Sequence, residues 1–228
     1  MSRLTPGLVG SESTGAGWPY VGVDLTGGRR PSDIAALDVS GSRVTFAQAT
    51  TDDEILAVLI NLGARIAAVD SPMDLPRGLC CLESTCSCSP IDPRPGRSAE
   101  RALAARGIPC FWTTKRTIIK GMVYRAIRLK AQLAAAGIEV LEVYPYAVKR
   151  VLLGRTLPKK SSAAGLAALV AGARLQLPTC CWPDPWTPGH DQLDALYCAM
   201  TARLHGEGQT EALGDPGEVP IIVPVMPG

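Results

Sequence analysis

Short apolar runs separated by glycine, serine and proline dominate the first third of the chain. Each run is rich in Val, Ile, Leu and Ala and too short for a helix, which predicts buried strands joined by tight turns. The expected strands are residues 20–28, which end in a glycine turn, 34–39, 43–47 and 65–72. Thr51 to Glu54 form a capping box, so a helix is expected to begin there and to end at Gly63.

Helical periodicity is more common in the rest of the chain. A cysteine- and proline-rich stretch at 72–97 has no regular pattern and is expected to be an irregular insertion. The segment 117–136 has apolar residues on one helical face and basic residues elsewhere, as in an amphipathic helix. Further helices are expected at 98–106, within 146–174 and at 190–204, with a strand at 139–145. The stretch 219–225 is predicted to be an edge strand, because its prolines exclude a central position in a sheet.

This order of elements predicts the fold class. Three strands joined by tight turns, then a helix and a further strand, form the core of a ribonuclease-H-like α/β fold. The first three strands would be antiparallel, the later ones would be parallel, and helices would flank the mixed sheet. We expect a single domain at 19–228 that contains the insertion, after a flexible leader at 1–18.

Charge and hydropathy narrow the class of protein. The net charge of +2 argues against a general polyanion-binding protein, but residues 94–160 hold fifteen Lys and Arg against three Asp and Glu. Such a segment could attract a phosphate backbone, or could be an ordinary solvated helical face. No apolar run is long enough to span a membrane and no secretory signal is recognisable, so we expect a cytoplasmic protein with no membrane partner.

Acidic residues stand at positions where an apolar core is expected. They end the first and fourth strands, interrupt the strand at 139–145 and begin the last helix. These residues are Asp24, Asp70, Glu142, Asp191 and Asp194. Carboxylates are costly to bury alone, and no Lys or Arg stands beside Asp24, Asp70 or Asp194 in the sequence. Mg²⁺ or Mn²⁺ would offset these costs together, and two such ions could cleave a phosphodiester bond.

Each acid also has an ordinary structural explanation. Asp191 could interact with the helix dipole, Asp24 could cap its own Thr-Gly-Gly turn, and Asp70 could belong to a turn before Ser-Pro. Glu142 is the hardest to explain in this way, since glutamate within a strand is disfavoured. One metal site explains all of these positions at once.

Other residues could complete such a site. His190 stands one turn before Asp194, so it could donate to a carboxylate or move protons, or be a surface residue at a helix start. Phe111 and Trp112 could stack on bases or pack in the core. The candidates for phosphate binding at a helix start are Lys115, Arg116 and Lys120.

Six segments, in order from about residue 20 to 224, resemble a prokaryotic family of predicted nucleases with a ribonuclease-H-like fold, domain of unknown function four-two-nine. They are VGVDLTGG, AAVDSPMDLP, GRSAERALAARGIP, EVLEVYPYAVKRVL, HDQLDALYCAMTA and EALGDPGEVPIIVP. HDQLDA also resembles the His-x-x-x-Asp-Ala ending of Holliday-junction resolvases, which share that fold.

The resemblance implies a metal-dependent phosphodiesterase with nucleic acid as its partner. The divalent-metal ligands that it implies are Asp24, Asp70, Asp191 and Asp194. Arg97, Glu100 and Arg101 match an R-x-x-E-R-like stretch of the family, and Arg97 and Arg101 are candidates for nucleic-acid binding. Ser98 stands where the family has a cysteine, and Val219 where it has a glycine.

Eight cysteines without a secretory signal are not expected to form structural disulfides. Half of them fall within the insertion, at Cys80, Cys81, Cys86 and Cys88. These thiols could hold an iron–sulfur cluster or Zn²⁺, with a fourth ligand from elsewhere, or could be free thiols or a redox disulfide. Cys110 and Cys180 or Cys181 are the other possible ligands, whereas Cys198 is expected in the core.

Three functions fit these features. The first is a metal-dependent nuclease, in which Asp24, Asp70 and the last helix hold the ions and Glu142 assists. The second is a nucleotide-binding phosphotransferase of the sugar-kinase and actin type, because DLTGG resembles its first phosphate loop, although the chain is too short for the usual two copies. The third is a noncatalytic nucleic-acid-binding protein that carries a cysteine metal cluster.

Overall fold

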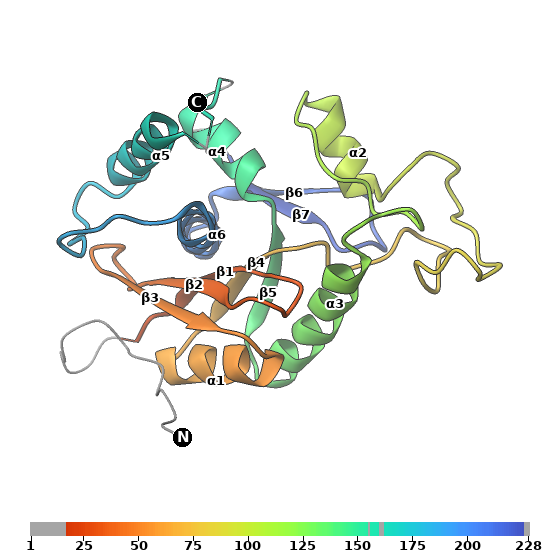
Figure 1. Cartoon of the computed structure of the whole chain (residues 1–228), viewed down its shortest axis with the longest axis horizontal. Helices are drawn as coiled ribbons and strands as arrows, with labels where there is room; N and C mark the ends of the chain where they lie inside the picture. Colours follow the sequence, from red (N-terminus) through yellow and green to blue (C-terminus); the bar gives the residue numbers. More distant parts are fainter. Residues whose placement is uncertain (1–16, 155, 160–161, 226–228) are drawn as a thin grey trace.

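The computed structural model describes residues 17–154, 156–159 and 162–225, so nearly all of the leader expected at 1–18 lies outside the described residues. A seven-stranded sheet in the order β3-β2-β1-β4-β5-β7-β6 runs through the molecule (Figure 1). The strands are β1 Tyr20–Asp24, β2 Ser32–Leu37, β3 Val44–Ala49, β4 Ile66–Asp70, β5 Glu139–Val143, β6 Thr210–Leu213 and β7 Ile221–Pro224.

The pairing of the strands confirms the predicted fold class. The strands β1, β2 and β3 are antiparallel neighbours, and the pairs β1–β4, β4–β5 and β5–β7 are parallel. This is the ribonuclease-H-like arrangement of three antiparallel strands followed by parallel ones. Because the parallel strands share one direction, the carboxyl ends of β1, β4 and β5 lie at the same edge of the sheet.

Helices cover both faces of the sheet. On one face α6 packs against β1, β2 and β4, and α4 and α5 pack behind it; α1 and α3 cover the other face (Figure 1). The short helix α2 lies beside β6. The bounds are α1 Asp52–Leu62, α2 Ser98–Ala105, α3 Lys120–Ala135, α4 Pro145–Leu153, α5 Ala163–Gln176 and α6 His190–Gly206. None of the described helices is long and apolar enough to cross a lipid bilayer.

Local sequence signals account for several of these boundaries. Thr51 accepts a hydrogen bond from the Glu54 backbone, and the Glu54 carboxylate accepts one from the Thr51 backbone, so the predicted capping box opens α1. Gly63 ends this helix in the left-handed conformation, with φ of +69°, as predicted. The helix expected from 117 begins three residues later, at Lys120.

The position predicted for the last strand is wrong. β7 is not an edge strand, because it lies between β5 and β6, and β6 is the edge. The prolines allow this position because Pro220 precedes the strand and Pro224 is its last residue, so the residues between them donate normally. β6 was missed, since four residues directly after a long helix carry little periodic signal.

Candidate active site

Asp24 and Asp70 lie side by side at the carboxyl ends of two neighbouring strands. Val23 of β1 is in register with Val69 of β4, so the next residue on each strand is an aspartate. Neighbouring strands are about 4.8 Å apart, and side chains alternate between the two faces of a sheet. Both carboxylates therefore extend from the same face, the one that α6 covers.

Helix α6 adds two more carboxylates above this edge. Asp191 and Asp194 lie in its first turns, three residues apart and on one face. The helix can approach because Gly22 has no side chain: a Cβ atom there would lie 2.0 Å from the Ala195 carbonyl oxygen. This contact explains why a glycine stands in the middle of a buried strand.

The four carboxylates influence one another. Burial, followed by the charges of Asp70, Asp194 and Asp191, raises the pKa of Asp24 to about 9. Asp33, which is opposite Asp24 on β2, adds a smaller effect in the same direction. Within the described residues no basic side chain forms an ion pair with Asp24. Four hard oxygen donors with excess negative charge suit Mg²⁺ or Mn²⁺, so the residues present fit such an ion.

Asp194 and Asp191 do have basic partners. This corrects the expectation for Asp194, which has no Lys or Arg beside it in the sequence. Lys149 of α4 forms a buried ion pair with Asp194. Asp191 lies 2.5 Å from His190 Nδ1 and 3.5 Å from the guanidinium of Arg30. Lys149 was missed because it is 45 residues from Asp194 in the chain, and only the packing of α4 on α6 brings the two together.

Glu142 does not join the four aspartates, so its predicted role beside them does not hold. It is in register with Val69 on β4, and therefore extends from the face of the sheet opposite to that of Asp70. Its carboxylate accepts hydrogen bonds from the Met73 backbone, at 2.7 Å, and from both terminal nitrogens of Arg97. Glutamate is tolerated within this strand because a buried cation neutralises it.

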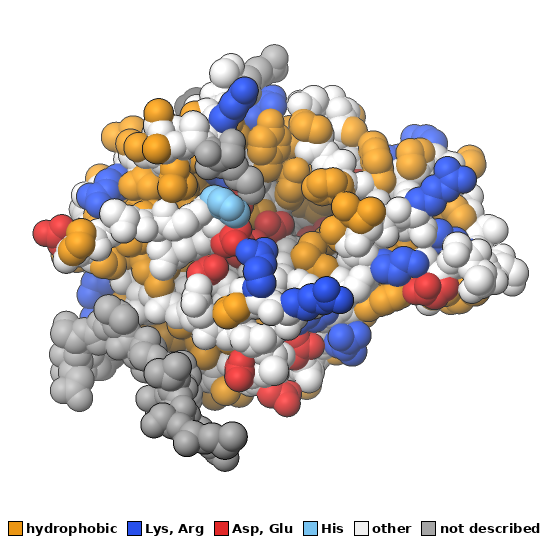
Figure 2. Space-filling model, viewed as in Figure 1, with side chains coloured by type: hydrophobic (Ala, Val, Ile, Leu, Met, Phe, Trp, Pro, Cys, Tyr) orange, Lys and Arg blue, Asp and Glu red, His pale blue; other side chains and the backbone are white. Residues whose placement is uncertain are grey.

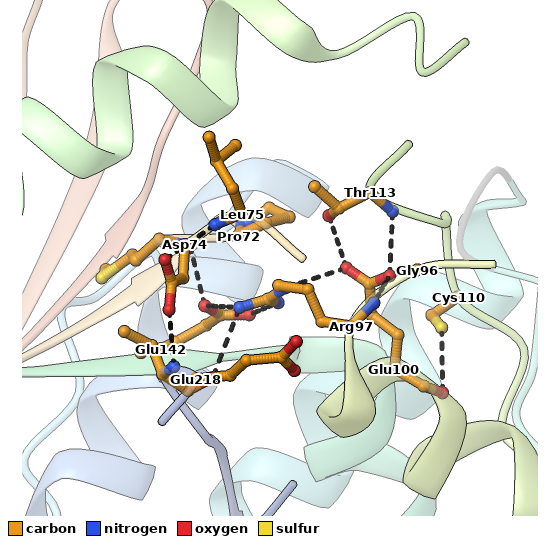
Figure 3. A network of polar contacts seen from close by, with 12 residues as sticks. Pro72, Asp74, Leu75, Gly96, Arg97, Glu100, Cys110, Thr113, Glu142 and Glu218 are labelled. Atoms are coloured by element: carbon orange, nitrogen blue, oxygen red, sulfur yellow. Dashed lines mark hydrogen bonds and ion pairs between the residues drawn. The ribbon is translucent and has the colours of Figure 1, made fainter. Parts of the chain in front are cut away.

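Arg97 is the centre of a buried polar network (Figure 3). Its guanidinium lies between Glu142 and Glu100, and Glu100 also accepts a hydrogen bond of 2.8 Å from the Thr113 backbone. Burial opposes the charge of Arg97, but the two carboxylates outweigh it and raise the pKa of the guanidinium. The side chain of Arg97 is 0% exposed, so the prediction that it contacts nucleic acid is wrong for this structure.

Contacts beside this network join the start of α2 and the segment after β4 to the residues that precede β7. The Ser98 backbone and hydroxyl each donate to Glu218 at 2.6 Å, and the Val219 backbone donates to Asp74 at 2.9 Å. The hydroxyl of Ser98 thus has a specific structural partner.

A cleft of about 390 Å³ connects the acidic edge to this network. Both charged side chains and aromatic or aliphatic side chains line it. The lining includes Asp70, Lys149, Asp194, Arg97, Glu100, Glu142, Phe111, Tyr144 and Tyr146. Acidic side chains and a histidine gather beside a hollow near the centre of one face of the molecule, with hydrophobic side chains along its rim (Figure 2). A substrate with both a charged and a flat apolar part would fit such a surface.

The other basic candidates differ in their availability. Lys115 donates to the carbonyl oxygens of two cysteines in the insertion, and Lys120 contacts Leu82 O and Glu83 at 3.3 and 3.2 Å. Arg101 contacts Asp92 at 3.0 Å. Arg116 is exposed. The first three therefore stabilise the insertion in this structure, and Arg116 is accessible to a ligand.

The glycine turn after β1 is closed by internal contacts. The Gly28 backbone donates to the Thr26 hydroxyl at 3.3 Å, and Arg125 of α3 donates to the Thr26 carbonyl oxygen at 2.8 Å. Arg125 is one of the basic residues outside the apolar face of its helix, yet it is buried and also bonded to Asp52. A turn whose amide is already used internally offers fewer donors to a phosphate group.

The insertion brings four cysteines together. The sulfur atoms of Cys80, Cys81, Cys86 and Cys88 all lie within 4.8 Å of one another, and they form the one such group of metal-binding side chains among the described residues. By contrast, no three of the four described aspartates at the sheet edge have carboxylate oxygens that all lie within 4.8 Å of one another. All eight cysteines are free thiols, and Cys198 is fully buried, as expected.

The sheet order, together with the aspartates at its carboxyl edge, defines a ribonuclease-H-like α/β protein. A family model described as "Protein of unknown function (DUF429)" matches residues 22–219, so the chain belongs to this family. The chain is also similar to a solved structure titled "Thermus thermophilus RuvC structure", with 15% identity, 88% of this chain and 98% of that chain covered, and a TM-score of 0.46. No curated protein matches the chain.

Proposed function

We propose that this protein is a metal-dependent phosphodiesterase that cleaves nucleic acid. The observation that carries the proposal is the juxtaposition of Asp24 and Asp70 on adjacent strands beneath Asp191 and Asp194 of α6. Such a concentration of carboxylates is costly without a cation. A partly buried acidic site at the carboxyl edge of a sheet is a typical place for catalysis in an α/β protein.

Each acid has a defined part in the proposed site. Asp24 and Asp70 would bind Mg²⁺ or Mn²⁺ from the sheet, and Asp191 and Asp194 from the helix. When bound, the ions supply a hydroxide-like nucleophile and stabilise the leaving oxygen. Lys149 keeps Asp194 in place and limits the negative charge of the site.

His190 and Arg30 are suited to handle the substrate. The His190 side chain is 51% exposed and contacts Asp191, so it can exchange protons with solvent beside the acids. The Arg30 side chain is 73% exposed and lies 3.5 Å from Asp191, where its guanidinium can also contact a phosphate. Lys and Arg side chains lie below the acidic hollow in this view (Figure 2).

The test is a cleavage screen with the purified full chain. Single- and double-stranded DNA, RNA, flaps and four-way junctions are incubated with Mg²⁺ or Mn²⁺. We expect cleavage of at least one substrate by the wild type and by Asp53→Asn, which alters an exposed acid at the start of α1. Asp24→Asn should reduce the rate at least about a hundredfold while keeping the fold. A wild type that cleaves none of them with either metal would overturn the proposal.

A further inference from the structure

We propose that Cys80, Cys81, Cys86 and Cys88 form a structural site for a single tetrahedral Zn²⁺ ion, separate from the acidic site. The argument starts from the segment that carries them. Residues 71–97 contain no helix or strand, although they connect β4 to α2 and line part of the cleft. Long irregular segments within a compact fold need specific restraints.

The spacing of the sulfur atoms fits one metal ion. Four thiolates around zinc, each at about 2.3 Å, lie about 3.8 Å from one another. The sulfur atoms of Cys80 and Cys86 are 3.6 Å apart, and all four sulfur atoms are within 4.8 Å of one another. In a 4Fe–4S cluster each thiolate binds a different iron atom, and in a 2Fe–2S cluster two thiolates bind each of two irons, so some of the sulfur atoms lie farther apart than around a single ion. The observed spacing therefore favours zinc over such a cluster.

The charge around the thiols also favours a metal thiolate. Four deprotonated cysteines around Zn²⁺ leave a net charge of about −2, because binding the ion releases four protons to solvent. Lys115 donates to the carbonyl oxygens of Cys86 and Cys88, the latter at 2.6 Å, and so places an ammonium group against the backbone of the loop that carries these two thiols. Lys120 contacts the Leu82 carbonyl oxygen, next to Cys81, at 3.3 Å, but its charge is already balanced by Glu83 at 3.2 Å. Both lysines come from the segment at the start of α3.

The proposed ion would hold the insertion against α3. The Tyr124 hydroxyl accepts a hydrogen bond of 2.6 Å from the Leu82 backbone, and the Leu82 side chain is fully buried. With Lys115 and Lys120, these contacts join the cysteine loop to the helix that supplies Met122 to the cleft. Zinc would thus fix one wall of the cleft without contacting the reacting groups.

The first experiment measures metal content in the full chain, purified anaerobically without chelators from medium that contains both zinc and iron. We expect one zinc and no inorganic sulfide per chain, and loss of the zinc in Cys86→Ser. The matched control is Cys181→Ser, an exposed cysteine outside the cluster, which should keep the zinc. Asp24→Asn should also keep it, so that failure of this proposal is distinguished from failure of the proposed nuclease.

A second experiment does not depend on the folding of a variant. Co²⁺ exchanged into the wild type should give the intense visible bands of a tetrahedral thiolate complex. Removal of the metal by a chelator should increase tryptic cleavage after Arg77, which is exposed at the edge of the insertion. Iron with inorganic sulfide, zinc that is retained by Cys86→Ser, a disulfide within the cluster, or an octahedral cobalt spectrum would each overturn the assignment.

Discussion

Lys149 and Asp194 form an ion pair in which the side chains are only 4% and 9% exposed. The lysine comes from α4 and the aspartate from α6, so the contact fixes the relative position of two helices behind the sheet. It also means that Asp194, like Asp191 beside Arg30, already has a positive partner without a bound metal ion.

Replacing Lys149 by methionine should therefore destabilise the metal-free protein. The change leaves Asp194 as a buried charge without this cation, which typically costs about 3–5 kcal/mol. Urea denaturation at pH 7 with a chelator of divalent ions measures the free energy of unfolding. Lys159→Met, at an exposed lysine, should change it by less than about 0.5 kcal/mol. Equal effects of the two substitutions would show that the ion pair does not stabilise the fold.

Glu142→Gln should also destabilise the protein, for a different reason. It removes a carboxylate from Arg97, whose side chain is completely buried, and so leaves the guanidinium with too little negative charge around it. A loss of about 3–5 kcal/mol in the free energy of unfolding is expected. Glu139→Gln is the matched control, since this glutamate is on the same strand with a side chain that is 55% exposed. If the two variants unfold at the same urea concentration, the network around Arg97 is not a stabilising one.

Gly22→Ala should separate α6 from the sheet. The new methyl group would lie 2.0 Å from the Ala195 carbonyl oxygen and 2.2 Å from the Ala199 backbone nitrogen, and neither backbone atom can move without its helix. We expect at least about 1–3 kcal/mol of destabilisation and a weaker stabilisation by Mn²⁺, because Asp191 and Asp194 move with the helix.

The control for this change is Gly27→Ala, where a methyl group would meet nothing within 4 Å. Thermal unfolding with and without Mn²⁺ measures both effects. Normal stability and a normal Mn²⁺ response of Gly22→Ala would contradict the close packing of α6 on β1.

The raised pKa of Asp24 predicts an unusual pH dependence. Burial and the neighbouring acids raise this pKa to about 9 in the folded protein, from an ordinary value of 3.8. Between these two pH values the folded protein binds more protons than the unfolded chain, so the stability of the metal-free protein should fall as the pH rises from 4 to 9.

Asp24→Asn should abolish the part of this decrease in stability with pH that comes from Asp24. The metal-free variant should consequently be more stable than the wild type at pH 8, by about 1 kcal/mol or more, although it lacks a proposed ligand. Urea denaturation across the pH range measures the difference. A wild type whose stability rises between pH 5 and pH 8, or an unchanged slope in Asp24→Asn, would contradict this account of the site.

Much of the fold could be predicted because its signals are local. The alternation of short apolar runs with tight turns predicted β1 to β4, and the capping box with Gly63 predicted α1 at both ends. The acids at the ends of β1 and β4 were also recognisable, since a charge that terminates an apolar strand stands out from its neighbours.

The errors concern relationships that only tertiary packing determines. Glu142 stood out as a charge within a strand, but the alternation of side chains and the position of Arg97 decide that it faces away from the aspartates. Lys149 carries no local signal, because a lysine in a helix is usually solvated. The edge position predicted for β7 was wrong because the order of strands depends on pairings far apart in the chain.

The most direct test of the central claim is Mn²⁺ binding to the purified protein, measured by the electron paramagnetic resonance signal of free Mn²⁺. We predict that the wild type binds the ion and that Asp53→Asn binds it equally well. Asp24→Asn and Asp70→Asn should each bind at least about tenfold more weakly, which is about 1.4 kcal/mol. Mn²⁺ affinity that is the same in all four proteins would contradict the claim that these aspartates jointly hold a metal ion.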